Sequence, residues 1–441
     1  MPSLPTELLI TPAFGPISGA ACLPGSKSLT NRLLVLAALA APEAHADHSV
    51  IQQALHAEDT EWMVAALRQL GIPISAAWEA GRLIVPAVPR QRWVSEADFY
   101  CGNSGTTLRF LAAMLALGRG RYRLDGSPRM RQRPIAELLD ALRQLGVQAD
   151  SEAGTGCPPV LLQTQGIVGD QARLSGARSS QFLSALLMAA PLADTAEVVL
   201  EVTPPLVSMP YVDMTLACVR AAGGVVHEER PPGPEGGRWR VPGRQHYRPR
   251  SWEVEPDASA ASYFLAAAAI TGGRVTIPGL NQHSWQGDVR FAQVLAAMGC
   301  TVEDNPLAVT GRTLTGIEVD MNAISDTVMT LAVVALFAQG PTRIRNVAHV
   351  RHKESDRLAA LAAELRKTGA AVHEWPDGLE IHPAPLHGAR LETYNDHRLA
   401  MAFALIGLRV PGIIVVDPGC VAKTFPGYFA ELERLRASGS G

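Results

Sequence analysis

Residues 23–32 read Leu-Pro-Gly-Ser-Lys-Ser-Leu-Thr-Asn-Arg, and an apolar run over residues 33–41 follows them. The Pro-Gly pair ends the preceding apolar segment, and the small polar residues after it are typical N-caps of a helix. Free backbone N–H groups at such a helix start attract anions, and Lys27 and Arg32 add positive charge there. Taken alone, the stretch also fits an ordinary capped helix with two solvated cations.

The same pattern of a small polar cluster followed by an Ala/Leu-rich helix occurs six times along the chain. Its markers are Lys27, Asn103, Ser179, Asp257, Asp326 and Asn395, at intervals of 76, 76, 78, 69 and 69 residues. A repeat of fixed period indicates one structural unit used several times.

A second, amphipathic helix is predicted in each unit, and a glycine ends most of them. We expect these helices over residues 62–70, 135–145, 212–222, 289–298 and 357–368, with a truncated sixth copy over 429–436. The glycines, at positions 71, 146, 223, 299 and 369, are spaced 75, 77, 76 and 70 residues apart. Glycine in this position is the usual left-handed residue just past a helix. Short β-branched runs after the glycines predict strands.

The first helix of each unit is apolar nearly all round, which places it in an interior. We therefore predict an α/β protein of two domains, each with three repeated α/β units, buried helices side by side and sheets outside. A segment rich in Pro, Gly and Arg over residues 230–250 indicates a boundary near residue 254. We expect a discontinuous domain of residues 1–25 and 255–441, into which residues 26–254 are inserted.

Composition excludes several classes of protein. With 47% hydrophobic and 18% charged residues, the 441-residue chain is expected to be ordered. A net charge of −3 argues against binding nucleic acid through overall charge. The six cysteines contain no CxxC pair, and apolar runs are too short to cross a bilayer. We expect a cytoplasmic protein that binds neither nucleic acid nor membranes.

Polar residues at the helix starts predict an anion-binding site. Dipoles and cations that converge in this way suit a substrate with more than one phosphate or carboxylate. Four polar loops, over residues 127–134, 207–211, 351–357 and 422–426, add to this set. Each loop alone fits a solvated surface, but together, at equivalent points of a repeat, they favour function.

Common catalytic motifs are excluded. Residues 25–28 lack the glycine that a P-loop has directly before its lysine, because Ser26 stands there. His349 and His352 lie three residues apart without a clear third ligand, so a metal site is not predicted. No Ser-His-Asp order or Gly-x-Ser-x-Gly turn is present.

The motifs identify a resemblance to the 5-enolpyruvylshikimate-3-phosphate synthases (3-phosphoshikimate 1-carboxyvinyltransferases). It is carried by PGSKSLTNR (24–32), GNSGTTLR (102–109), PRMRQRP (128–134), SSQFLSALLMAAPL (179–192), DASAASYFLAAAAI (257–270), KESDRL (353–358), YNDHRLAM (394–401) and AKTFPGYF (422–429). The resemblance implies the inside-out barrel fold of enolpyruvyl transferases. It also implies transfer of the carboxyvinyl group of phosphoenolpyruvate to the 5-hydroxyl of shikimate 3-phosphate by addition and elimination. No metal or organic cofactor is implied, and we expect a monomer.

The resemblance also assigns residues by position. The catalytic candidates are Lys27, Asp326, Glu354 and His397. Shikimate 3-phosphate is expected to contact Lys27, Ser28, Arg32, Ser179, Ser180, Gln181, Ser208, Tyr211, Asp326, His349 and Lys353. Phosphoenolpyruvate is expected to contact Lys27, Asn103, Gly105, Arg129, Gln181, Arg357, Arg398 and Lys423. Asp326 is the candidate base at the 5-hydroxyl, Glu354 is the candidate carboxyl for the C3 proton, and Lys27 would assist the leaving phosphate.

Departures from the family pattern bear on affinity. His349 stands where the family often has asparagine, Met209 replaces a frequent lysine, and Phe110 stands where many members have proline. Gly105 keeps the small residue of members that bind glyphosate, so we expect inhibition by glyphosate.

Three other classes of protein would require features that this sequence lacks, or would lack residues that it has. The sister transferase that acts on UDP-N-acetylglucosamine uses a loop cysteine, whereas residues 127–134 contain none and Cys157 comes too late. A non-catalytic anion-binding protein would be expected to lack Asp326, Glu354 or Lys27. A nucleotide-dependent kinase would need a phosphate loop.

Overall fold

The computed structural model describes residues 4–230 and 235–438. Over these residues the chain forms six β-sheets and twelve α-helices, joined by short 3₁₀ turns. Contacts divide it into two units. The inserted unit is Gly25–Val254, and the discontinuous unit comprises the chain up to Pro24 and from Glu255 onward.

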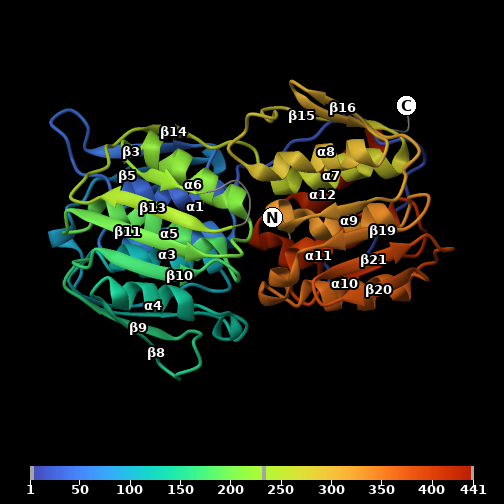
Figure 1. The fold of residues 1–441 in the computed structure, drawn as a ribbon. Helices are drawn as coiled ribbons and strands as arrows, with labels where there is room; N and C mark the ends of the chain where they lie inside the picture. Colours follow the sequence, from blue (N-terminus) through green and yellow to red (C-terminus); the bar gives the residue numbers. More distant parts are fainter. Residues whose placement is uncertain (1–3, 231–234, 439–441) are drawn as a thin grey trace. The chain divides into compact units, whose positions relative to one another are not determined.

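The inserted unit contains three four-stranded sheets of identical topology (Figure 1). In each, the first two strands are parallel and the other two pairings are antiparallel. The sheets are β14 (Ser251–Glu253), β3 (His48–Gln52), β5 (Arg82–Pro86) and β4 (Ser75–Ala77); β6 (Glu96–Tyr100), β7 (Gly120–Asp125), β9 (Val160–Thr164) and β8 (Gln148–Ser151); and β10 (Gln171–Ser175), β11 (Glu197–Thr203), β13 (Gly237–Pro242) and β12 (His227–Glu229).

Six helices belong to the inserted unit: α1 (Lys27–Ala38), α2 (Glu58–Gln69), α3 (Gly105–Leu115), α4 (Ala136–Gln144), α5 (Ser180–Ala189) and α6 (Met209–Ala221). Helices α1, α3 and α5 are buried along almost their whole length. Helix α1 packs against α3 and α6, and α5 packs against the same two helices. The interior of this unit is therefore a ring of four helices.

The discontinuous unit repeats this plan. Its sheets are β2 (Gly19–Ala20), β15 (Arg274–Ile277), β17 (Leu307–Thr310) and β16 (Thr301–Asp304); β18 (Glu318–Asp320), β19 (Thr342–Arg345), β21 (Gly378–His382) and β20 (Ala371–Trp375); and β1 (Glu7–Leu9), β23 (Ile414–Val416) and β22 (Arg390–Glu392). Its helices are α7 (Ala258–Thr271), α8 (Phe291–Ala297), α9 (Val328–Ala335), α10 (Arg357–Lys367), α11 (His397–Gly407) and α12 (Tyr428–Ser438). Helices α7, α9 and α11 are buried and pack against one another.

The predicted α/β fold of repeated units is confirmed by these elements. Gly71, Gly146, Gly223, Gly299 and Gly369 all have a positive φ, as predicted for glycines past helix ends. Helix α2 begins at Glu58 rather than at residue 62, because the acidic first turn that precedes the apolar positions is also helical.

Helix α8 is shorter than predicted, since the residues Gly287–Arg290 before it form a 3₁₀ turn.

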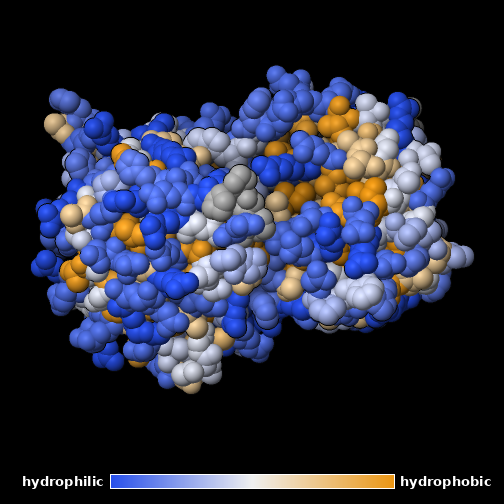
Figure 2. Space-filling view, viewed as in Figure 1, coloured by the Kyte–Doolittle hydropathy of each residue, from blue (hydrophilic) through white to orange (hydrophobic). Residues whose placement is uncertain are grey.

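Each unit has its own hydrophobic core. One cluster of buried side chains runs from Leu29 to Val254, and the other draws on both parts of the discontinuous unit. Polar residues cover much of the visible surface, and an apolar area remains on the discontinuous unit (Figure 2).

Within residues 4–230 and 235–438, no helix has both the length and the apolar character needed to cross a membrane.

We predict that Phe264→Ala lowers the free energy of unfolding by about 3–5 kcal/mol, because it leaves a cavity in a packed core. Phe264 is fully buried in α7, and its ring lies 6.1 Å from that of Phe425 and 5.7 Å from that of Tyr428. Urea denaturation measures the loss. Phe14, which is 84% exposed, provides the matched control, and Phe14→Ala should cost less than ~1 kcal/mol. Equal losses in the two variants would contradict this description of the core.

Candidate active site

In the inserted unit, hydrogen bonds between polar side chains join the N-terminal halves of neighbouring helices. Asn31 of α1 donates to the hydroxyl of Thr106 in α3 at 2.8 Å. Thr215 of α6 donates to Ser184 of α5 at 2.9 Å. These bonds hold the helix starts, and the predicted ligand-binding residues on them, at one end of the helix ring.

Serine side chains cap the three buried helices. Ser26, Ser104 and Ser179 accept hydrogen bonds from the backbone N–H groups of Leu29, Thr107 and Gln181. Capping leaves other N–H groups of the first turn available to an anion. Ser28 and Ser180 lie in these same first turns.

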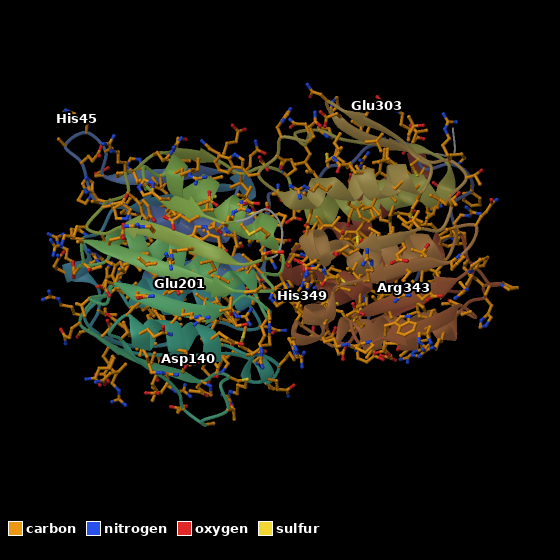
Figure 3. All side chains as sticks on the ribbon, in the orientation of Figure 1. His45, Asp140, Glu201, Glu303, Arg343 and His349 are labelled. Carbon is orange, nitrogen blue, oxygen red and sulfur yellow. The ribbon has the colours of Figure 1, made fainter. Side chains whose placement is uncertain are left out.

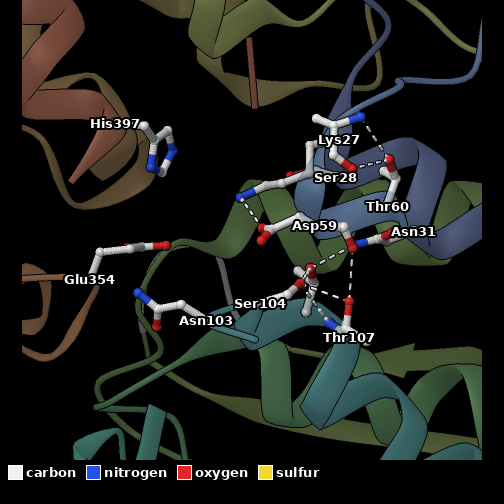
Figure 4. A network of polar contacts seen from close by, with 12 residues as sticks. Lys27, Ser28, Asn31, Asp59, Thr60, Asn103, Ser104, Thr107, Glu354 and His397 are labelled. Carbon is white, nitrogen blue, oxygen red and sulfur yellow. Dashed lines mark hydrogen bonds and ion pairs between the residues drawn. The ribbon is translucent and has the colours of Figure 1, made fainter. Parts of the chain in front are cut away.

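Lys27 lies at the start of α1 beside a buried carboxylate that the sequence reasoning missed. Its ammonium nitrogen is 3.4 Å from Oδ2 of Asp59 in α2, and the Asp59 side chain is only 3% exposed (Figure 4). This ion pair fixes the ammonium group of Lys27 at the end of the helix ring where α1 begins. Because Asp59 belongs to the next helix, no local spacing in the sequence connects it with Lys27.

Arg32 was predicted to contact shikimate 3-phosphate, and the structure places it largely inside the protein. It donates to Thr215, to Ser184 and to the carbonyl oxygens of Ser28 and Tyr211. Burial is the main cause that lowers the pKa of its guanidinium, to about 10. Its guanidinium also lies 5.1 Å from the ring centre of Phe110. The phenylalanine that stands where many family members have proline therefore packs against Arg32.

The remaining predicted residues of the inserted unit lie at helix starts and on the loops that precede them. Ser208 is 3% exposed and precedes α6 with a φ of 53°. Tyr211 follows in the first turn of α6, and its carbonyl oxygen accepts from Arg32. Arg129 lies in the arginine-rich loop and donates to Gln132 of the same loop at 3.2 Å. Asn103 and Gln181 accept hydrogen bonds from two further arginines, described below, and Gly105 is the first residue of α3.

In the discontinuous unit, Asp326 is surrounded by cations. Its carboxylate lies 3.2 Å from Nη1 of Arg357, 2.8 Å from Nη2 of Arg398 and 3.7 Å from Nζ of Lys353. These are three of the four predicted ligand-binding cations of this unit, and the structure brings them to the predicted base.

Arg357 is the centre of the charged cluster of this unit. Its side chain is 1% exposed and also contacts Glu354 at 2.9 Å and Asp396 at 2.9 Å. Burial lowers its pKa, but Asp396, Glu354 and Asp326 together outweigh burial and raise it. The guanidinium therefore remains charged, and it fixes the direction of the Glu354 carboxylate.

Three other predicted residues of the discontinuous unit are buried. His397 begins α11, and its Nδ1 lies 3.7 Å from Oδ1 of Asp396. Lys423 is 5% exposed in a 3₁₀ turn that packs against α11. His349 is 4% exposed in the turn Ala348–His352 (Figure 3). Burial, then the charge of Lys353, lowers the pKa of His349 to about 3.

Two buried carboxylates of this unit were not predicted. Asp396 is fully buried, caps α11 and accepts from Ser355. Asp288 is 3% exposed and accepts from Ser259, whose oxygen is 3.4 Å from Nη2 of Arg398. Burial, and next the charge of Asp326, raises the pKa of Asp288. Asp396 could have been found in its motif, whereas nothing near Asp288 in the sequence connects it with Arg398.

Solved structures with the same fold define the class of protein. EPSP synthase from Acinetobacter baumannii superposes with a TM-score of 0.78 at 26% identity, over 97% of this chain and 98% of that one. The enolpyruvyl transferase NikO from Streptomyces tendae has a TM-score of 0.72 at 20% identity, over 97% of each chain, which shows the fold alone. The fold is that of the enolpyruvyl transferases.

Sequence comparison then gives the family. The model of the EPSP synthase (3-phosphoshikimate 1-carboxyvinyltransferase) family matches residues 13–432. A 3-phosphoshikimate 1-carboxyvinyltransferase of Nostoc punctiforme is 45% identical over 95% of this chain and 97% of its own length. A chloroplastic 3-phosphoshikimate 1-carboxyvinyltransferase of Arabidopsis thaliana is 45% identical over 98% and 84%, respectively. This chain belongs to the EPSP synthase family, which confirms the resemblance carried by its motifs.

Acid should destabilise the protein through His349. The folded state keeps this imidazole neutral down to a pKa of about 3, whereas the unfolded chain binds a proton below about 6.5. The unfolded state thus holds more protons between these values, and stability falls as pH drops through them. We therefore expect the free energy of unfolding of His349→Asn, relative to that of the native chain, to rise by about 1–3 kcal/mol as the pH falls from 7 to 4.

Urea denaturation at a series of pH values measures this difference. The exposed His283 provides the control, and His283→Asn should leave the pH dependence of unfolding unchanged. A gain of equal size in both variants would show that burial of His349 is not the cause.

Proposed function

We propose that this chain transfers the carboxyvinyl group of phosphoenolpyruvate to the 5-hydroxyl of shikimate 3-phosphate and releases phosphate. It thereby acts in the shikimate pathway, which leads to chorismate and the aromatic amino acids. Family membership supports the reaction. The observation that carries the assignment of the site is Asp326 surrounded by Lys353, Arg357 and Arg398. A carboxylate next to several cations suits a base that works beside bound anions.

In the inserted unit, we assign shikimate 3-phosphate to the helix starts. Its acceptor oxygens would receive hydrogen bonds from Ser28, Ser179, Ser180 and Ser208 and from first-turn N–H groups, while Tyr211 and Gln181 contact the substrate. Arg32 acts mainly indirectly, because its guanidinium donates hydrogen bonds to the carbonyl oxygens of Ser28 and Tyr211 and so positions these residues.

Lys27 carries the charge that assists the leaving phosphate. Its contact with Asp59 holds the ammonium group in place while the phosphate is absent. Phosphoenolpyruvate contacts the segment of Asn103 and Gly105 and the side chain of Arg129.

In the discontinuous unit, the cations serve anion binding and the carboxylates serve proton transfer. Arg357, Arg398 and Lys423 bind phosphoenolpyruvate, and Lys353 and His349 bind shikimate 3-phosphate. Because His349 is neutral at pH 7, it contributes a hydrogen bond rather than a charge.

The reaction begins when Asp326 accepts the 5-hydroxyl proton and C3 of phosphoenolpyruvate gains a proton from Glu354. The hydroxyl oxygen bonds to C2. Loss of the C3 proton to Glu354 and departure of phosphate then restore the double bond. His397 supports the transfer.

Phosphate release from phosphoenolpyruvate, measured with and without shikimate 3-phosphate, tests the reaction. We expect release only with the acceptor, together with a product of the mass of the carboxyvinyl adduct. Release that requires UDP-N-acetylglucosamine instead would assign the sister reaction. Binding of shikimate 3-phosphate without any release would support an anion-binding protein that lacks the chemistry.

The monomeric state and the cytoplasmic location stay predictions. Light scattering of the purified protein would decide the first, and fractionation of the source cells the second.

We predict that Glu354→Gln lowers kcat by about 10²–10⁴-fold, the range for removal of a general acid or base. The amide keeps an oxygen for the hydrogen bond from Arg357, so the affinity for shikimate 3-phosphate should change little. Single-turnover kinetics and equilibrium binding measure the two quantities.

Glu303 provides the control for this substitution, because its exposed carboxylate pairs only on the surface with Arg274 (Figure 3). Glu303→Gln should retain full kcat. If Glu354→Gln instead weakens binding as strongly as turnover, Glu354 holds substrate rather than transferring the proton.

Glyphosate should compete with phosphoenolpyruvate, and Gly105→Ala should raise its inhibition constant at least about tenfold. A Cβ atom at this position would lie 2.6 Å from Nη2 of Arg133, so the added methyl group would displace the arginine next to an expected phosphoenolpyruvate contact. Inhibition titrations at several phosphoenolpyruvate concentrations measure the effect. Unchanged inhibition of Gly105→Ala would place glyphosate elsewhere.

A further inference from the structure

Two buried arginines of the inserted unit lie among the predicted substrate contacts but have no assigned role. Arg109, in the second turn of α3, is 4% exposed, and Arg133, in the arginine-rich loop of residues 127–134, is 2% exposed. Neither side chain is available to bulk solvent. Burial of a guanidinium is costly unless hydrogen bonds compensate, so the partners of these groups indicate what they do.

Arg109 fixes the orientation of the Gln181 amide. Its Nη1 donates to Oε1 of Gln181 at 2.7 Å, its Nη2 donates to the carbonyl oxygen of Pro134 at 2.9 Å, and its guanidinium lies 5.0 Å from the ring centre of Phe182. A guanidinium has only donors, so the end of the amide that faces it must be the oxygen. The NH₂ group of Gln181 is therefore the end turned away from Arg109.

Arg133 acts in the same way on Asn103. Its Nη1 donates to the backbone carbonyl oxygen of Asn103 at 2.8 Å and to Oδ1 of the same residue at 3.1 Å. The NH₂ group of Asn103 is then the end turned away from Arg133. Both amides thus direct a donor, rather than an oxygen, away from the arginines.

Gly105 permits this arrangement. A Cβ atom there would lie 2.6 Å from Nη2 of Arg133 and 3.2 Å from Nη1 of Arg109, both closer than ordinary contact. The missing side chain at the first position of α3 leaves space for both guanidinium groups. Glycine at this position therefore lets both guanidinium groups keep their present positions.

We propose that Arg109 and Arg133 are positioning residues that lock Gln181 and Asn103 as hydrogen-bond donors to the substrates. The proposal rests on the proposed function, because both substrates present phosphate and carboxylate oxygens that only accept hydrogen bonds from the protein. A reversed amide would point its oxygen at these anions. The arginines exclude that rotamer before the substrate arrives, which lowers the cost of ordering on binding.

A double-mutant cycle on Arg109 and Gln181 tests the proposal, with kcat/KM for shikimate 3-phosphate as the readout. Arg109→Met and Gln181→Met should each lower kcat/KM about 10- to 100-fold, the value of a hydrogen bond that involves a charged group. Because Arg109 acts through Gln181, the double variant should be no more than about twofold worse than Gln181→Met alone. If the loss of kcat/KM in the double variant instead equals the product of the losses in the two single variants, the proposal is overturned.

The exposed pair Arg123 and Glu152, joined by hydrogen bonds on the sheet of the same unit, provides the control cycle. Arg123→Met and Glu152→Gln should leave kcat/KM unchanged. Thermal unfolding of every variant separates the effects: if Arg109→Met lowers only the melting temperature and leaves kcat/KM intact, Arg109 is merely structural and the proposal fails.

Gln181→Glu gives a second test that does not depend on the folding of the Arg109 variant. The new carboxylate keeps the bond from Arg109, so the melting temperature should be retained, but the donor is lost. We expect kcat/KM to fall at least about tenfold. Full activity of Gln181→Glu would show that the donor is unnecessary and overturn the proposal. Phosphate release by the native chain distinguishes failure of this proposal from failure of the proposed function. If the native chain releases no phosphate, the proposed function itself is refuted.

Discussion

A helix that is buried along its length can carry polar groups only at its ends, and this constraint determines where chemistry is possible in the protein. Helices α1, α3 and α5 in one unit, and α7, α9 and α11 in the other, have almost no solvated face. Their first N–H groups still need partners. In each unit, capping side chains and basic residues gather at these helix starts, so the candidate site follows from the way the interior is filled.

Charges in the discontinuous unit are paired with one another. Arg357 is held among three carboxylates, and Asp326 among three cations. Such a cluster costs little reorganisation on binding, because its dipoles and charges already have fixed directions. The carboxylates of Asp326, Glu354 and Asp396 also offset the repulsion between the neighbouring cations of this cluster.

Much of this arrangement could be predicted from the sequence. Two independent landmarks, the polar markers and the glycines, keep the same period, which is enough to predict the repeated α/β units and to place Lys27, Gln181 and Asp326 at helix starts. Asp59 and Asp288 could not be predicted in their roles, because their partners lie on other elements and only the packing of those elements brings them together. The burial of Arg32 was missed for a related reason, since a cation at a helix start is normally solvated.

The N-terminal strands have a consequence for synthesis of the chain. Strand β1 pairs with β23, and β2 pairs with β15, so a segment made before the inserted unit completes two sheets whose other strands are made after it. About 400 residues separate β1 from its partner, which at typical ribosomal speeds is roughly 20–80 s of translation. During that interval the inserted unit has all its own strands and can fold, whereas the leading segment waits with an unpaired edge.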